Sequence, residues 1–165
     1  MKGEFIMERI ASFQVDHIRL NRGIYVSRID EINGNYLTSF DIRMKLPNRE
    51  PVINIAELHT MEHLGATFLR NHPVWKEQIV YFGPMGCRTG FYLILKEKLE
   101  SKDIVELMKE LYKFMAEFKG DIPGATAIEC GNYLDQNLPM ANYEAKKYLE
   151  EILENLGEEN LNYPD

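Results

Sequence analysis

The chain has 165 residues, of which 45% are hydrophobic and 27% are charged, and its formal net charge is −7 at pH 7. This length and composition predict one globular domain, residues 1–165, and exclude fibrous and disordered proteins. The acidic balance argues against nucleic acid as a partner, because binding a phosphate backbone requires Lys and Arg gathered on one face.

The beginning of the chain and its apolar runs bear on localisation. The first ten residues mix four charged side chains with apolar ones, so they lack the continuous apolar centre of a signal peptide. No apolar run approaches the roughly 20 residues that span a bilayer. We therefore expect a cytoplasmic protein without a membrane partner, in which Cys87 and Cys130 do not form a disulfide.

The first half of the chain predicts a hairpin followed by a helix. Residues 24–45 alternate β-formers with polar residues around Asn33 and Gly34, a dipeptide that suits a type I′ turn, and this pattern predicts a β-hairpin. Helix formers fill residues 54–71, with Asn54 as a candidate N-cap and a Glu three positions later. This segment is expected to be a long helix.

The second half predicts further strands and helices. Four segments have the required patterns, two short β-type runs and two stretches of helical apolar spacing: residues 78–82, 90–95, 101–118 and 139–156. Ser101 is the candidate cap of the first of these helices, residues 125–135 have no clear pattern, and the acidic tail 157–165 is expected to be frayed. The mixture predicts an α+β fold, an antiparallel sheet packed against helices in a single-domain sandwich.

The strongest chemical motif lies inside the first predicted helix. At 100° per residue, Glu62 and His63 fall about 60° to one side and about 40° to the other side of His59, so all three share one face. Two imidazoles at this spacing can hold one divalent metal ion, although solvated histidines without a ligand are the plain alternative. A catalytic site needs a third ligand, for which Cys130 and Glu129 are the candidates; a buried structural thiol is the other interpretation of this cysteine.

The other cysteine lies in a turn-rich loop. Glycines near Cys87 leave backbone N–H groups free, and the neighbouring Arg88 brings a positive charge that favours thiolate over thiol. A reactive cysteine is the favoured interpretation. The alternative is a turn residue with no chemistry and a solvated Arg88.

Five sequence blocks together carry a family resemblance. Three are at residues 59–64 (HTMEHL), 83–92 (GPMGCRTGFY) and 129–131 (ECG), and two more are at 12–17 (SFQVDH) and 40–43 (FDIR). The first three resemble the signature blocks of the S-ribosylhomocysteine lyase family, the autoinducer-2 synthases, and the other two resemble further blocks of that family. They occur in order over nearly the whole chain. The resemblance implies cleavage of S-ribosylhomocysteine to homocysteine and 4,5-dihydroxy-2,3-pentanedione, the autoinducer-2 precursor, by two carbonyl migrations and a β-elimination.

The resemblance also implies roles for single residues. His59, His63 and Cys130 would bind one divalent metal ion per subunit, with Fe²⁺ as the native ion and Zn²⁺ or Co²⁺ able to replace it. Cys87 and Glu62 would be the acid/base pair. The products would connect the enzyme to autoinducer synthesis in quorum sensing and to the methionine cycle.

A second group of residues would bind substrate. The resemblance implies that Ser12, His17 and Arg43 hold the sugar, in active sites shared across a homodimer interface. Their plain alternatives are a cap or turn, a surface residue and an exposed strand charge. The chain departs from the common family pattern at three positions, which leaves its contacts to the homocysteine end of the substrate open: Tyr81, Gly83 and Gln136.

Two rival interpretations use the same histidines. The motif His-x-x-Glu-His is also that of inverted-motif zinc peptidases, with Glu62 as the base and Glu129 as the third ligand. A non-catalytic binding domain would instead use a closed structural metal site made of the two histidines and both cysteines.

Overall fold

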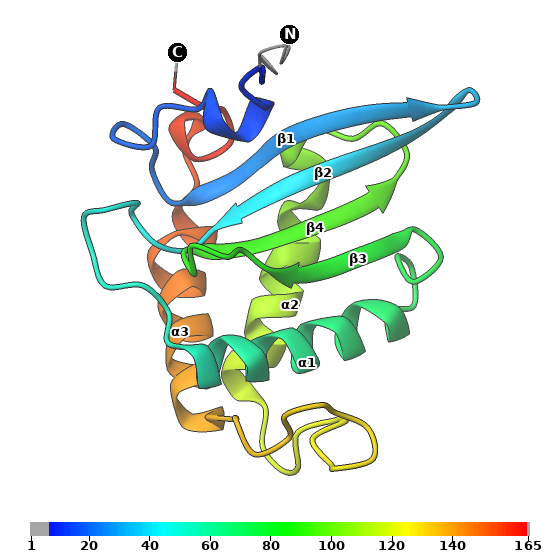
Figure 1. Cartoon of the computed structure of the whole chain (residues 1–165), viewed down its shortest axis with the longest axis vertical. Helices are drawn as coiled ribbons and strands as arrows, with labels where there is room; N and C mark the ends of the chain where they lie inside the picture. Colours follow the sequence, from blue (N-terminus) through cyan, green and yellow to red (C-terminus); the bar gives the residue numbers. More distant parts are fainter. Residues whose placement is uncertain (1–6, 165) are drawn as a thin grey trace, which may run out of the picture.

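The computed structural model describes residues 7–164, so the two ends of the predicted domain, residues 1–6 and 165, lie outside the described residues. Four strands form one antiparallel sheet in the order β1-β2-β4-β3. Figure 1 shows α2 passing behind this sheet and α1 running beside β3. The predicted fold class, an antiparallel sheet packed against helices in an α+β sandwich, is confirmed.

The predicted hairpin is present. Strands β1 (Gly23–Ile32) and β2 (Asn35–Arg43) pair antiparallel, and their turn consists of Asn33 and Gly34. Both turn residues have positive φ, 52° and 79°, as a type I′ turn requires. The hairpin is therefore specified locally, by the two residues that tolerate this conformation.

Strands β3 (Ile79–Pro84) and β4 (Gly90–Lys96) complete the sheet and separate its two faces. Alternate side chains of β4 point toward the helices and are fully buried in the core: Phe91, Leu93 and Leu95. Tyr92 and Ile94 point to the opposite face, where they line an open groove. One face of the sheet thus belongs to the core, and the other is available for function.

Helix α1 (Ile55–Asn71) begins as predicted. Asn54 is its N-cap, and the backbone N–H of Asn54 donates to the Glu57 carboxylate at 3.0 Å, which completes a capping box. Met61 and Leu64 on this helix are fully buried in the core. The burial of these two side chains fixes the rotation of α1 about its own axis. It therefore also fixes the direction of the helix face that carries His59 and His63.

The other two helices differ from the predictions at their ends. The segment predicted as residues 101–118 starts with a 3-10 turn, η2 (Ser101–Ile104), and continues as α2 (Val105–Glu117). Ser101 is not the cap; the cap is Glu100, whose backbone N–H donates to the Asp103 carboxylate at 2.7 Å. The last helix stops earlier than the predicted residue 156, and a 3-10 turn follows it: α3 (Leu138–Glu151) and η3 (Leu153–Asn155).

The C-terminal tail corrects a prediction. Residues 157–164 were expected to be frayed, but they contain a 3-10 turn, η4 (Glu158–Asn160), and pack against the sheet. Asn160 donates to the backbone oxygen of Arg22 at 2.8 Å, and the Tyr163 ring stacks on Tyr25 with centroids 4.8 Å apart. Asn160 and Tyr163 therefore hold the tail in place. The acidic composition of the tail, on which the prediction of fraying was based, does not indicate such contacts.

Between residues 7 and 164, none of the helices combines the length and the apolar character needed to cross a bilayer.

Candidate metal centre and thiol pocket

Three predicted metal ligands come together. His59 and His63 on α1 and Cys130 from the loop between α2 and α3 offer ligand atoms that all lie within 4.8 Å of one another. The two Nε2 atoms are 3.0 Å apart, and Cys130 Sγ is 3.5 Å from His59 Nε2. Tetrahedral zinc with ordinary Zn–N and Zn–S bonds needs separations of about 3.3 Å and about 3.6 Å. The donor set therefore fits one divalent ion.

Backbone carbonyls orient both imidazoles. His59 Nδ1 lies 2.9 Å from the backbone oxygen of Asp135, and His63 Nδ1 lies 2.7 Å from that of Pro123. Metal-binding histidines usually donate their second ring N–H to such a carbonyl, which fixes the tautomer and turns the free Nε2 toward the ion. The loop that supplies Cys130 thus also aims both histidines.

Thr60 and Gln136 lie behind His59; Thr60 was not predicted as part of the site, and Gln136 was named only as a departure from the family pattern. The fully buried Thr60 hydroxyl donates to Gln136 Oε1 at 2.6 Å and accepts the backbone N–H of Asn137 at 2.9 Å. Gln136 Nε2 is also 3.3 Å from His59 Nδ1, but both atoms are donors when Nδ1–H bonds to Asp135, so this contact adds no hydrogen bond. One feature of the sequence could have identified Thr60: it is a polar residue at a core position of α1, directly after His59. This network ties the loop to the helix at the metal centre.

The two carboxylates near the group have different surroundings. Glu62 is half-buried beside His63 and, within residues 7–164, makes no hydrogen bond or ion pair, so its carboxylate is available to a substrate. Glu129 instead accepts the Thr126 hydroxyl at 2.7 Å and is not part of the metal group. The peptidase interpretation, which needs Glu129 as a ligand, is therefore not favoured.

The predicted substrate residues gather around the second thiol. One pocket is lined by all three of them together with Cys87: Ser12, His17, Arg43 and Cys87. Cys87 is exposed in the turn between β3 and β4, where the neighbouring Arg88 has a φ of 59°, the left-handed conformation of a tight turn. Ser12 comes from the 3-10 turn η1 (Ala11–Phe13). We call this site the thiol pocket.

Arg43 is the central charge of the thiol pocket. It is 4% exposed, so the alternative of an exposed strand charge is wrong. Its Nη1 donates to Thr89 Oγ1 at 2.7 Å and lies 3.9 Å from Cys87 Sγ. Burial opposes the charged form of Arg43, but the ion pair with Asp41 outweighs burial and raises the pKa of the guanidinium. A fixed positive charge therefore lies beside the sulfur.

The metal centre and the thiol pocket are separate within the chain. In the described part of the chain, the metal group contains both histidines and Cys130 but not Cys87. The residues lining the thiol pocket include neither His59 nor Glu62. The interpretation as a closed site with four ligands is thus contradicted.

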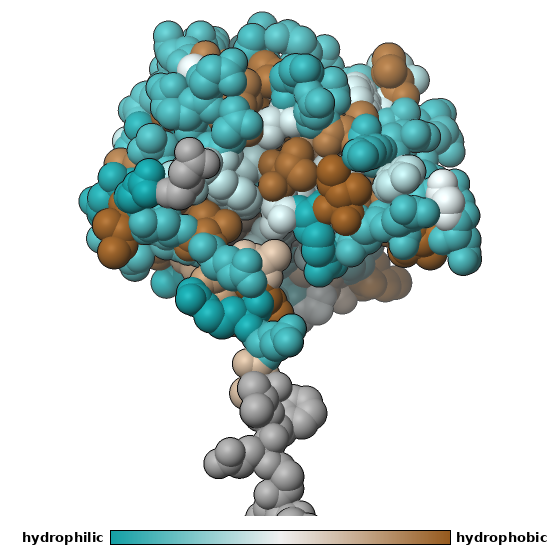
Figure 2. Space-filling view, turned by 90° about the horizontal axis from the view of Figure 1, so that it is seen from above, coloured by the Kyte–Doolittle hydropathy of each residue, from teal (hydrophilic) through white to brown (hydrophobic). Residues whose placement is uncertain are grey.

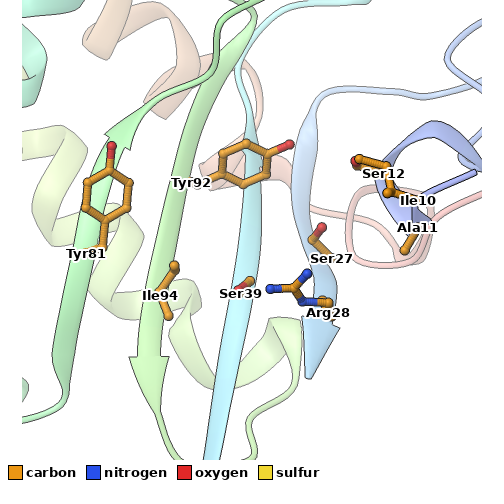
Figure 3. Close-up of a pocket in the computed structure, with 9 residues that line it drawn as sticks. All are labelled: Ile10, Ala11, Ser12, Ser27, Arg28, Ser39, Tyr81, Tyr92 and Ile94. Carbon is orange, nitrogen blue, oxygen red and sulfur yellow. The ribbon is translucent and has the colours of Figure 1, made fainter. Parts of the chain in front are cut away.

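The uncovered sheet face carries a groove next to the thiol pocket. Figure 3 shows Tyr81 and Tyr92 standing over this face opposite Ser12. The Tyr81 ring lies over Gly83, where a Cβ on residue 83 would meet the Tyr81 hydroxyl unless that side chain turned away. Figure 2 shows hydrophobic side chains exposed among polar ones on the upper side of the molecule.

The chain is similar to proteins of known activity. It matches the family model described as S-Ribosylhomocysteinase (LuxS) over residues 10–159. A protein named S-ribosylhomocysteine lyase from Clostridium acetobutylicum is 62% identical over 159 residues, which are 96% of this chain and 100% of that protein. Proteins of the same name from Phocaeicola vulgatus and Borrelia garinii are 60% and 57% identical over 158 residues, again 96% of this chain, and 98% and 100% of theirs. The matched region contains the metal group and the pocket residues around Cys87.

Proposed function

The chain belongs to the S-ribosylhomocysteine lyase family, and we propose that its metal centre and thiol pocket together carry out that reaction. The activity is that of a carbon-sulfur lyase acting on S-ribosylhomocysteine. In the proposed site, His59, His63 and Cys130 hold the metal ion, and Cys87 and Glu62 are the acid/base pair. The observation that carries this proposal is the convergence of three ligand atoms within 4.8 Å on and beside α1, the helix that also carries Glu62.

The chemistry requires that a carbonyl be moved before the thioether can leave. Homocysteine departs from C5 of the sugar by β-elimination only when a ketone is at C3, so the carbonyl must migrate from C1 to C2 and then to C3. A divalent ion held at the metal centre would act as a Lewis acid and make the C–H bonds beside the carbonyl more acidic. The products are homocysteine and 4,5-dihydroxy-2,3-pentanedione.

The proton transfers are assigned to two residues. Cys87 as thiolate takes a proton from one sugar carbon and returns it to the adjacent carbon, in a pocket where Arg43 supplies positive charge. Glu62 moves protons among the sugar oxygens and finally removes the proton at C4. Ser12 and His17, which line the pocket of Cys87, hold the sugar hydroxyls.

The metal ion is proposed to be Fe²⁺, with Zn²⁺ or Co²⁺ able to replace it. Two imidazoles and one thiolate form a donor set that suits each of these ions, so availability in the cell decides which is bound. Both cysteines are free thiols, and both proposed roles need reduced sulfur. A cytoplasmic location, where thiols stay reduced, follows from these roles.

The active enzyme is proposed to be a homodimer with shared sites. Cys87 and the metal group lie in separate places in one chain, whereas one substrate must reach both. The uncovered sheet face next to Cys87 exposes Phe13 (64%) and Tyr81 (47%), which a second copy would bury. Dimerisation would bring the thiol pocket of one subunit to the metal centre of its partner.

The products give the reaction its place in metabolism. We assign the pentanedione product to autoinducer synthesis for quorum sensing and the homocysteine to the methionine cycle.

An anaerobic assay tests the proposed roles. Purified, metal-loaded protein is incubated with S-ribosylhomocysteine, and the free thiol of homocysteine is followed over time. We expect thiol release by the natural protein and its loss in both Cys87→Ala and Glu62→Gln, with the metal content unchanged. Substantial release by either variant would refute the role of that residue.

A further inference from the structure

We propose that Tyr163, through a buried ion pair on β2, positions the charge that lies beside Cys87. Tyr163 is therefore a positioning residue for the reaction, supplied by the C-terminal tail. It lies beyond residues 10–159, the part of the chain that matches the family model. The inference rests on the proposed role of Cys87 and gives the ordered tail a function.

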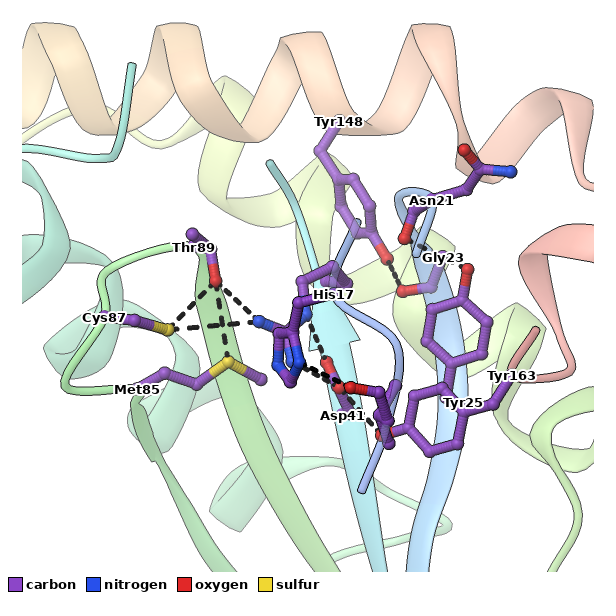
Figure 4. A network of polar contacts seen from close by, with 12 residues as sticks. His17, Asn21, Gly23, Tyr25, Asp41, Met85, Cys87, Thr89, Tyr148 and Tyr163 are labelled. Atoms are coloured by element: carbon purple, nitrogen blue, oxygen red, sulfur yellow. Dashed lines mark hydrogen bonds and ion pairs between the residues drawn. The ribbon is translucent and has the colours of Figure 1, made fainter. Parts of the chain in front are cut away.

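The first step of the argument is the contact between the tail and the sheet. The Tyr163 hydroxyl donates to Asp41 Oδ2 at 2.8 Å. Its ring stacks on Tyr25 at an interplanar angle of 14°, and Figure 4 shows the two rings lying together beside Asp41. Asp41 is almost completely buried, and the stacked tyrosine rings help to exclude water from its carboxylate.

The second step leads from the carboxylate to the thiol. Both Asp41 oxygens accept from Arg43, Oδ1 from Nε at 3.0 Å and Oδ2 from Nη2 at 2.6 Å. This paired geometry fixes the plane of the guanidinium. The remaining nitrogen, Nη1, then lies 2.7 Å from Thr89 Oγ1 and 3.9 Å from Cys87 Sγ. The orientation of Asp41 therefore determines where the positive charge lies.

The third step is the contribution of the Tyr163 hydroxyl to the orientation of the Asp41 carboxylate. Asp41 Oδ2 accepts two hydrogen bonds, one from Arg43 and one from Tyr163. A buried carboxylate is stabilised only when its lone pairs are satisfied, and the loss of one donor leaves it free to turn or to admit water. The guanidinium would follow the carboxylate away from the sulfur.

Other charged or titratable groups also face the thiol pocket. His17, Glu50 and Tyr92 line it, and Arg88 is adjacent in the chain. None of the described hydrogen bonds or ion pairs joins these groups to Tyr163, so a change at residue 163 leaves their contacts in place. An altered thiol in a Tyr163 variant would therefore be due to the Asp41–Arg43 pair.

The test uses Tyr163→Phe, which keeps the stacked ring and removes only the hydroxyl. The rate of Cys87 alkylation by iodoacetamide is measured on zinc-loaded protein across neutral and alkaline pH, with Cys87→Ala as the blank for reaction at Cys130. We expect the rate at neutral pH to fall about threefold and to recover at alkaline pH, because a displaced cation stabilises the thiolate less.

The matched control is Tyr143→Phe on α3. Tyr143 is exposed and makes no hydrogen bond with any residue from 7 to 164. The pH profile of Cys87 alkylation in Tyr143→Phe should therefore coincide with that of the natural protein. A Tyr163→Phe profile that also coincides would overturn the inference, and so would a loss of lyase activity with an unchanged profile, which indicates a purely structural role. Because alkylation needs no substrate, a failure of the proposed lyase roles would be seen separately.

Discussion

The metal centre and the thiol pocket are supported in different ways. Backbone oxygens of an irregular loop aim the histidines of the metal centre, while those histidines themselves are placed by one rigid helix. In the thiol pocket, side chains from β2, from the turn between β3 and β4 and from the C-terminal tail hold Arg43 beside Cys87. The orientation of the two histidines therefore depends on the path of the loop backbone, whereas the position of Arg43 depends on individual side chains.

The difference also affects how far each site can be recognised from sequence. The two histidines of the metal centre are four residues apart on one helix, so their proximity is a local property. The three partners of the buried ion pair at the thiol pocket, by contrast, come from distant parts of the chain: Asp41, Thr89 and Tyr163. Four predictions test this contrast, beginning with the largest expected effect.

Mixing two inactive variants tests whether the two sites meet across a dimer. Equal amounts of Cys87→Ala and Glu62→Gln protein are dissociated together and allowed to reassociate. Half of the dimers will then be mixed, and each mixed dimer has one of its two sites intact, so we expect about one quarter of the natural activity. Thiol release is the measurement. If mixing restores no activity, both groups act within one subunit.

Removal of the charge in the thiol pocket should destabilise the fold without affecting the metal centre. Arg43→Met leaves the buried Asp41 without its ion pair, so we expect the free energy of unfolding to fall by about 3 kcal/mol in a urea titration. The matched control is Arg28→Met, whose exposed pair with Asp30 should be worth less than about 1 kcal/mol. Equal losses in the two variants would contradict the importance of the buried pair.

Loss of the hydrogen bonds behind the metal centre should lower its affinity for the metal ion. Thr60→Val keeps the shape of the side chain but removes the hydroxyl that joins Gln136 and Asn137 to α1. We expect zinc affinity, measured by competition with a chelator, to fall about tenfold. The control is Thr67→Val on the same helix, because the Thr67 hydroxyl makes no hydrogen bond within the described residues. An unchanged affinity in Thr60→Val would show that the backbone carbonyls alone aim His59.

Alkaline pH should lower the stability of the fold in part through ionisation of Tyr163. Burial, and then the charge of Asp41, raise the pKa of Tyr163 above its ordinary value near 10. The folded chain thus holds the Tyr163 proton more tightly than the unfolded chain does. The resulting contribution to stability is complete below about pH 10, and it is lost as the pH rises through the higher pKa of Tyr163 in the folded chain. Tyr163→Phe should show a smaller loss of stability above pH 10 in urea titrations. A loss as large as that of Tyr143→Phe would contradict the raised pKa.

Local signals predicted much of the fold. Asn33 and Gly34 specified the hairpin, and Asn54 with Glu57 specified the start of α1, because each structure depends on neighbours within a few residues. The cap of the next helical segment was misplaced by one residue. Glu100 and Ser101 are both followed by polar residues, and the hydrogen bond from the Glu100 backbone N–H to the Asp103 carboxylate identifies Glu100 as the cap.

The sequence by itself determined the spacing of His59 and His63 on α1, the glycine-rich turn around Cys87 and, through five ordered blocks, the family. The tertiary structure decided what surrounds these groups. It placed Cys130 rather than Glu129 beside the histidines, separated the metal centre from the thiol pocket, and attached Tyr163 to Asp41 across 122 positions of the chain. Helical spacing is a short-range property of the backbone, whereas contacts between distant residues exist only after strands, loops and tail have packed.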